Sequence, residues 1–168
     1  MADQQPPAAA PTPPARERVF LVVVDETEEM KNALLYACRR AIRTDGRVAL
    51  LLVIEPVEFQ HWLGVGRVLE EETRREAEQR LQTLATQVFQ QTGKMPVLHL
   101  REGKRAEELV ALIREDPSIS LLVLGTSSEQ ASPGPIVSYL LSNLGKHVRI
   151  PVTLVPGQLS EEEIAALS

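Results

Sequence analysis

The stretch Leu121-Leu122-Val123-Leu124-Gly125-Thr126-Ser127-Ser128 decides the fold class of this chain. Four aliphatic residues in succession are typical of a strand that is buried on both faces, as the strands of parallel sheets are. The strand leads into a turn of small residues, and we expect a helix to follow from about Pro135. Ligands of open α/β sheets bind outside the carboxyl ends of the strands. This turn is therefore the first candidate for a phosphate-binding loop.

Similar apolar runs occur on both sides of this stretch. They predict strands at 19–24, 48–54 and 97–100 before it and at 152–155 after it. Pro151 and Pro156 bracket the last run, which suits a strand at a sheet edge. Helical patterns separate the strands, so the chain is predicted to be an α/β protein with five parallel strands and helices on both faces.

The first helix is predicted to begin at Thr27, a candidate N-cap followed by two acids, and to end at Asp45-Gly46. Cys38 falls on its apolar face, so we expect a core cysteine rather than a redox thiol. Helical spacing also gives apolar faces to the helices after Gly103 and Pro135. The three predicted faces are Met30, Ala33, Leu34, Ala37, Cys38, Ala41 and Ile42; Ala106, Leu109, Val110 and Ile113; and Ile136, Val137, Leu140, Leu141, Leu144 and Val148.

The predicted helix at 69–91 is unusually long. It would span roughly 34 Å, whereas a strand of ordinary length spans only ~17–20 Å. Its first third is charged, with Glu70–Arg74, Glu71–Arg75 and Glu76–Arg80 at the favourable i, i+4 spacing. We therefore expect it to overhang the sheet, either as a solvated face or as a partner-binding projection or lid. Its predicted apolar face is Ala77, Leu81, Leu84, Ala85, Val88 and Phe89.

Length and composition indicate one domain of ordinary globular character, with 43% hydrophobic and 24% charged residues among 168. Residues 1–16 are rich in Pro and Ala and are predicted to be a disordered tail. The folded domain is predicted at 17–157, and a capping box at Ser160–Glu163 predicts a short helix within 158–168.

The net charge of −5 argues against nucleic acid or an anionic membrane as the main partner. No apolar run is long enough to predict a transmembrane helix, and no signal peptide is visible. A single cysteine excludes an internal disulfide. Together these features predict a cytoplasmic protein.

Two residues stand at the carboxyl ends of strands that the pattern places side by side. Asp25 follows the first strand and Gly125 follows the fourth. Asp25 has two interpretations: an acid that caps the following helix, or a hydrogen-bond acceptor for a base amino group or a ribose hydroxyl. Local sequence leaves both open.

The ordered set of motifs resembles the universal stress protein family over about residues 18–157. The motifs are Val22-Val23-Val24-Asp25 before a helix, Leu51-Leu52-Val53-Ile54-Glu55-Pro56, Arg101-Glu102-Gly103 before Ala106-Glu107-Glu108-Leu109, and Leu122-Val123-Leu124-Gly125 leading to Ile150-Pro151-Val152-Thr153-Leu154-Val155. The resemblance implies a doubly wound, Rossmann-like fold, similar to that of the adenine nucleotide hydrolases, with strand order 3-2-1-4-5. It also implies homodimers, often paired through the fifth strand.

The resemblance further implies an adenine site in the members that bind nucleotides. In those members an Asp after strand one and a Val on strand two hold the base, which matches Asp25 and Val53. A pattern G-x-x-G, nine residues, G-[S/T] holds the ribose and phosphates, and Gly125 matches its first glycine. Ser128 and Ser138 stand at the other glycine positions and Tyr139 at the Ser/Thr position. Glycine permits close approach of the backbone to phosphate, so the chain is closer to members that lack the motif.

Other candidates for chemistry are weaker. His61, His99 and His147 lack the spacing of metal ligands, and no nucleophile elbow is present. Arg101, Lys104 and Arg105 lie at the end of the third strand, where they could reach an anion or form a solvated helix start. Trp62, in the segment after the second strand, is either folded onto the sheet or an exposed anchor for a partner protein.

The sequence thus predicts a non-catalytic universal stress protein-like regulatory domain that acts as a homodimer, with weak or no nucleotide binding. One alternative is an ATP- or AMP-binding switch in which Asp25, Val53 and Gly125 hold the base side while Ser127 and Ser128 face the phosphates. A hydrolase and an adaptor that binds a partner through the Trp62 loop are further alternatives.

Overall fold

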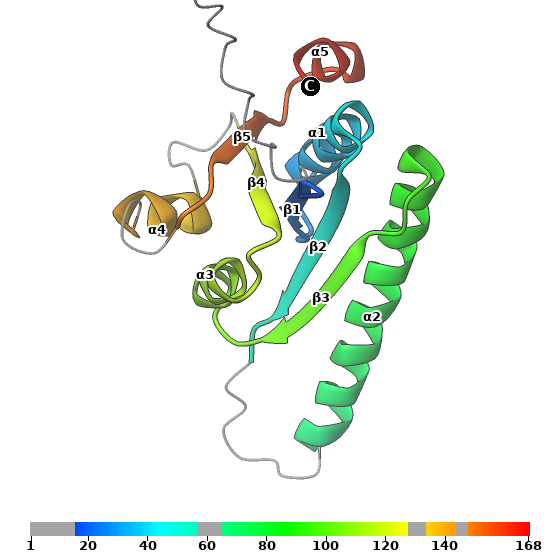
Figure 1. The fold of residues 1–168 in the computed structure, drawn as a ribbon. Coiled ribbons are helices and arrows are strands. Elements are labelled where there is room, and N and C mark those ends of the chain that lie inside the picture. The colour runs from blue at the N-terminus through cyan, green and yellow to red at the C-terminus, as the bar shows by residue number, and fades with distance from the viewer. Residues whose placement is uncertain (1–15, 57–64, 128–133, 144–147) are drawn as a thin grey trace, which may run out of the picture.

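The computed structural model describes residues 16–56, 65–127, 134–143 and 148–168. Its centre is a five-stranded parallel sheet (Figure 1) with the order β3-β2-β1-β4-β5, as the resemblance implied. The strands are β1 (Val19–Val23), β2 (Arg47–Ile54), β3 (Val97–Glu102), β4 (Ile119–Thr126) and β5 (Val152–Pro156). The helices are α1 (Glu29–Thr44), α2 (Val65–Thr92), α3 (Arg105–Glu115), α4 (Pro135–Asn143) and α5 (Glu161–Leu167).

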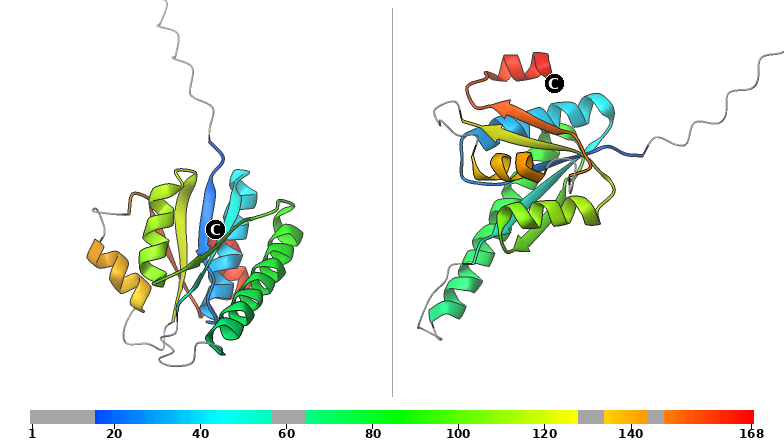
Figure 2. Two further views of the ribbon diagram at one scale, coloured as in Figure 1. Left: turned by 90° about the horizontal axis from the view of Figure 1, so that it is seen from below. Right: turned by 90° about the vertical axis from the view of Figure 1, so that its left-hand side faces the viewer.

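Helices cover both faces of the sheet, so β1 is buried along its whole length (Figures 1 and 2). Helices α3 and α4 lie on one face, where Leu109, Ile113 and Leu140 pack against Leu21 and Leu122. Helices α1 and α2 lie on the other face. Two separate apolar layers result, one on each side of the sheet, and this explains why the strands are continuous apolar runs rather than alternating ones.

Helix α1 starts later than the sequence predicts. Its N-cap is Glu28, not Thr27, and only Glu29 is an acid in its first turn. Thr27 instead donates to the Asp25 carboxylate, from its backbone N–H (2.9 Å) and its hydroxyl (2.6 Å), closing a tight turn ahead of the helix. Asp45 ends α1 in the left-handed conformation, with φ of 51°. The predicted apolar face is buried except for Ile42, which is 53% exposed at the last turn.

Helix α2 is longer than predicted, running for 28 residues, and its first turns project beyond the sheet (Figure 2, right). The predicted apolar face packs on the sheet, but Phe89 at its end is 47% exposed. Arg74 pairs with Glu78 and Glu102 (3.3 and 2.7 Å) rather than with Glu70, because β3 brings a second acid within its reach. The overhang is thus tied to the sheet edge as well as stabilised locally.

The remaining helices differ in smaller ways. Helix α4 ends at Asn143. Of its predicted apolar face, Val148 is buried but lies after the helix, and Leu141 is exposed. Helix α5 begins with the predicted capping box, in which Ser160 Oγ accepts from the Glu163 backbone N–H. It lies against the end of α1.

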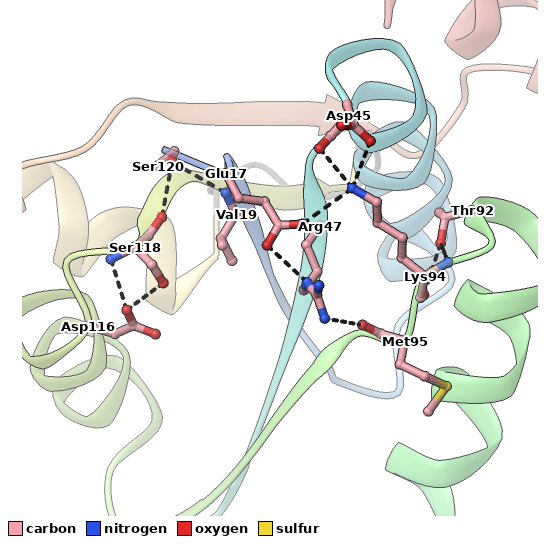
Figure 3. Close-up of polar contacts among 10 residues, drawn as sticks. All are labelled: Glu17, Val19, Asp45, Arg47, Thr92, Lys94, Met95, Asp116, Ser118 and Ser120. Carbon is pink, nitrogen blue, oxygen red and sulfur yellow. Dashed lines mark hydrogen bonds and ion pairs between the residues drawn. The ribbon is translucent and has the colours of Figure 1, made fainter. Parts of the chain in front are cut away.

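The amino edge of the sheet is held by an ion-pair network (Figure 3). The Lys94 ammonium, between α2 and β3, contacts Asp45 Oδ1 (2.8 Å) and Glu17 Oε1 (3.3 Å). Glu17 also binds Arg47 Nε (3.2 Å) on β2. The network joins the segment before β1, the end of α1 and the start of β3.

Candidate functional site

The carboxyl edge of the sheet brings three of the predicted site residues together. Val23 pairs with Leu51, so two residues further on Asp25 stands level with Val53. On the other side of β1, Val22 pairs with Val123, which places Gly125 at the same edge. The strand order reverses between β1 and β4, and such a switch point is where open α/β sheets bind ligands.

Two adjoining pockets open along this edge. The larger, about 730 Å³, lies between the ends of β1 and β2 and helix α2. Leu52, Val53 and Ala77 give it apolar wall, while Asp25 and Thr73 add polar groups. The smaller, about 290 Å³, lies between the ends of β1 and β4 and the starts of α1 and α4, and it includes Gly125 and Ser127. Asp25, Thr27 and Arg105 line both pockets, so we treat them as one crevice.

Helix α2 forms one wall of the larger pocket through Arg80. The Arg80 guanidinium donates to the backbone oxygen of Asp25 and pairs with Glu26 at 3.3 Å. These contacts tie the segment between β1 and α1 to α2. The sequence pattern did not single out Arg80, because its partners lie 54 and 55 residues away.

Gly125 lines the smaller pocket and also has a packing role. It lies within β4, not in a turn after it. A Cβ atom at this position would stand 2.3 Å from the Glu29 carbonyl oxygen and 2.8 Å from the Glu29 Cβ atom. The missing side chain therefore allows α1 to begin directly against β4, so packing requires a glycine here.

Glu29 is the residue at this site that the sequence interpretation missed. Hydrogen bonds from its own backbone N–H and from the Ser127 side chain hold the pKa of the Glu29 carboxyl group below its ordinary value. The smaller pocket is thus lined by an ionised carboxylate beside Ser127. The sequence position of Glu29 could have indicated this role. A helix that follows β1 begins at the carboxyl edge of the sheet, where Gly125 also lies.

The crevice carries more acid than base. Asp25, Glu26, Glu55 and Glu76 line the larger pocket, and Asp25 and Glu29 line the smaller one. Arg105 is the one cation lining the smaller pocket within the described residues, and it pairs with Glu55 at 3.6 Å. An anionic ligand would enter a field of the wrong sign.

The other two cations near the third strand are engaged elsewhere. Arg101 contacts Glu115 (2.5 Å) and Glu108 (3.4 Å), and Lys104 pairs with Glu107 (3.3 Å). Both neighbouring acids of Arg101 come from α3, so this guanidinium fastens β3 to that helix.

Several predicted residues lie outside the described part of the chain. They are Ser128, His61, Trp62 and His147. Ser138 and Tyr139 lie on α4, and Tyr139 is 36% exposed. In the described ranges, no group of three or more His, Cys, Asp and Glu side chains could hold a metal ion.

Cys38 is buried as predicted, and burial raises the pKa of its thiol to about 12. None of the helices in the described ranges combines the length and apolar character that crossing a membrane requires.

Comparison with known families gives the decisive observation: the model of the universal stress protein family matches residues 17–156. The chain belongs to the universal stress protein family. No curated protein is similar enough in sequence to count as a match.

Solved structures of universal stress proteins share the fold of this member. The universal stress protein UspA from Lactobacillus plantarum is 21% identical, with a TM-score of 0.69, covering 84% of this chain and 99% of its own. A family member from Burkholderia pseudomallei is 23% identical, with a TM-score of 0.64 and coverage of 86% and 99%. A member from Arabidopsis thaliana, solved with AMP bound, is 12% identical, with a TM-score of 0.55 and coverage of 86% and 94%.

Proposed function

We propose that this universal stress protein is a non-catalytic regulatory domain of the cytoplasm, which acts as a homodimer and binds nucleotide weakly or not at all. The observation that carries the proposal is the filled position beside Gly125. The start of α1 occupies the space next to this glycine, and the Glu29 carboxylate accepts the hydrogen bonds of Ser127 and of its own N–H. A phosphate would need those donors.

Catalysis of phosphoryl transfer needs positive charge around the transferring group. Among the described residues, the acids that line this crevice outnumber the cations, and Arg105 pairs with Glu55. A regulatory role through binding or assembly is therefore favoured over hydrolysis.

A homodimer is supported by the exposed edge of β5. This strand ends the sheet, and Leu154 in its middle is 44% exposed. An apolar, unpaired edge strand is a template for pairing with another chain. In the proposed homodimer, the β5 edge of a second copy of this chain pairs with this edge.

The first test asks whether nucleotide accompanies the protein. The chain is purified natively and denatured, and the released small molecules are identified by mass spectrometry. We expect adenine nucleotide far below one molecule per chain and ATP hydrolysis at the background rate. Stoichiometric ATP, or turnover that rises with protein concentration, would overturn the proposal.

An adenine-nucleotide switch is the second candidate, and one observation favours it. Asp25 and Val53 line one continuous pocket, as the alternative requires, and Ser127 stands at the adjoining one. If the switch is correct, millimolar ATP raises the melting temperature and Asp25→Ala abolishes that rise. If ATP leaves the melting temperature of the unsubstituted chain unchanged, this candidate is excluded.

A further inference from the structure

The two ends of the crevice differ in chemistry. The end between β2 and α2 has apolar walls from Leu52, Val53 and Ala77, with the Asp25 carboxylate at its rim. Such an end suits a flat heterocycle with an amino group that donates to the carboxylate. The end between β4 and α1 is the one that holds the Glu29 carboxylate.

Packing fixes the place of Glu29. Gly125 and Gly157 both lie against it: a Cβ atom on Gly125 would stand 2.8 Å from Glu29 Cβ, and one on Gly157 would stand 2.5 Å from Glu29 Cγ. The two glycines border the side chain from β4 and from the residue after β5. The two glycines therefore leave room for Cβ and Cγ of Glu29, a residue that lines the smaller pocket.

The hydrogen bonds of the carboxylate are those that an incoming anion would seek. The backbone N–H at the start of a helix and a serine hydroxyl at the end of a strand form a common anion-binding arrangement. Here both donate to Glu29. A phosphate group entering the pocket would have to displace this internal anion or lie beside it.

We propose that Glu29 is a specificity-determining residue that excludes phosphorylated ligands, so that the ligand of this crevice is an uncharged nucleoside whose base carries an amino group. The inference rests on the proposed function, in which nucleotide binds weakly or not at all. It adds the cause of that weak binding and the class of ligand that the crevice accepts. The Glu29 carboxylate repels a phosphate group by its charge, and it accepts the hydrogen bonds of the backbone N–H and of Ser127 that a phosphate would otherwise accept.

The test compares the affinities of adenosine, AMP and ATP by isothermal titration calorimetry, in EDTA to exclude divalent cations. The variants are Glu29→Gln and Glu29→Ala. Glu28→Gln is the matched control, because it removes the same charge at the neighbouring position. The Glu28 side chain is 84% exposed and does not line the pocket. Circular dichroism melts verify that each variant folds.

We expect the unsubstituted chain to bind adenosine more tightly than AMP and AMP more tightly than ATP. Glu29→Gln should tighten the binding of AMP and ATP by at least about tenfold and leave adenosine within about twofold. Glu28→Gln should behave as the unsubstituted chain does.

Three results would overturn the inference, and they can be told apart. If adenosine binds but Glu29→Gln leaves the AMP affinity unchanged, Glu29 does not select. If none of the three ligands binds to any folded variant, the crevice is not a nucleoside site, while the proposed regulatory function stands. If the unsubstituted chain binds ATP more tightly than adenosine, both the inference and the proposed function fail.

Discussion

Gly125 and Glu29 lie so close that a Cβ atom on the glycine would stand 2.3 Å from the carbonyl oxygen of the glutamate. The atom it would meet belongs to the backbone, so relief requires that α1 shift away from β4. We expect Gly125→Ala to lower the free energy of unfolding by about 1–3 kcal/mol through overpacking. Urea denaturation measures the change.

The control for this substitution is Gly66→Ala on the projecting part of α2, where an added Cβ atom meets no atom within 4 Å. Alanine is favoured over glycine in a helix by about 0.8–1.0 kcal/mol, so this variant should be slightly more stable. Equal stability of Gly125→Ala and the unsubstituted chain would contradict the packing interpretation of Gly125.

Asn32 connects α1 to the segment after β5. Its amide nitrogen lies within hydrogen-bond distance of the carbonyl oxygens of Pro156 (3.2 Å), Gly157 (2.9 Å) and Leu159 (3.0 Å). Asn32→Asp replaces this donor with a carboxylate, so we expect a loss of about 1–3 kcal/mol at neutral pH. The loss should shrink in acid, where the carboxyl group is protonated and donates again. A loss that does not change with pH would contradict the role of the amide as donor.

The Cys38 thiol should resist alkylation in the folded protein. Burial raises its pKa to about 12, so almost no thiolate is present at pH 8. Iodoacetamide should modify it only after denaturation in guanidinium, as mass spectrometry would reveal. Rapid modification of the native protein would show that α1 opens locally.

The network around Lys94 should make stability depend on pH in both directions. The pKa of Glu17 is lowered because hydrogen bonds from Arg47 and Lys94 outweigh the effect of burial, and Lys94 lowers the pKa of Asp45. These carboxylates stabilise the fold above their unfolded pKa values, and that contribution is lost as the pH falls. The pKa of Lys94 is raised, chiefly by Asp45, so its contribution is lost as the pH rises through the folded value.

The full contribution of the network is therefore expected between about pH 5 and pH 10. Lys94→Met should make the melting temperature depend less on pH on the acid and alkaline sides of this range. Lys31→Met is the control, because Lys31 pairs only with exposed Glu28 among the described residues. If Lys94→Met changes the melting temperatures at acid pH no more than Lys31→Met does, the network does not contribute to the pH dependence of stability.

The β5 edge gives the prediction on assembly. Leu154→Lys places a charge on the exposed edge, which opposes strand pairing between chains. Light scattering at micromolar concentration should give a dimer for the unsubstituted chain and a monomer for this variant. Val68→Lys, at a 64% exposed position on α2, should remain dimeric. A monomeric unsubstituted chain would contradict the proposed homodimer.

The order of elements could be predicted from the sequence because each strand is an uninterrupted apolar run. A run such as Val19–Val23 can only be buried on both faces, which requires a parallel sheet with helices on either side. Helix limits were less well predicted: α2 begins four residues before the expected start, at a segment without apolar spacing. The ends of apolar faces were also wrong, since Ile42 and Phe89 lie past the margin of the sheet and have nothing to pack against.

By itself, the sequence determined the family resemblance, the sheet, and the position of Asp25, Val53 and Gly125 at one edge, because local apolar patterns and strand order fix these. Only the tertiary structure decided what lies around them. Glu29 and Gly125 are 96 residues apart in sequence, and only folding brings them into contact. The glycine suggests a phosphate loop when considered as a motif. In the folded chain the missing side chain leaves room for the first residue of α1, whose carboxylate adds to the negative charge of Asp25 at that end of the crevice.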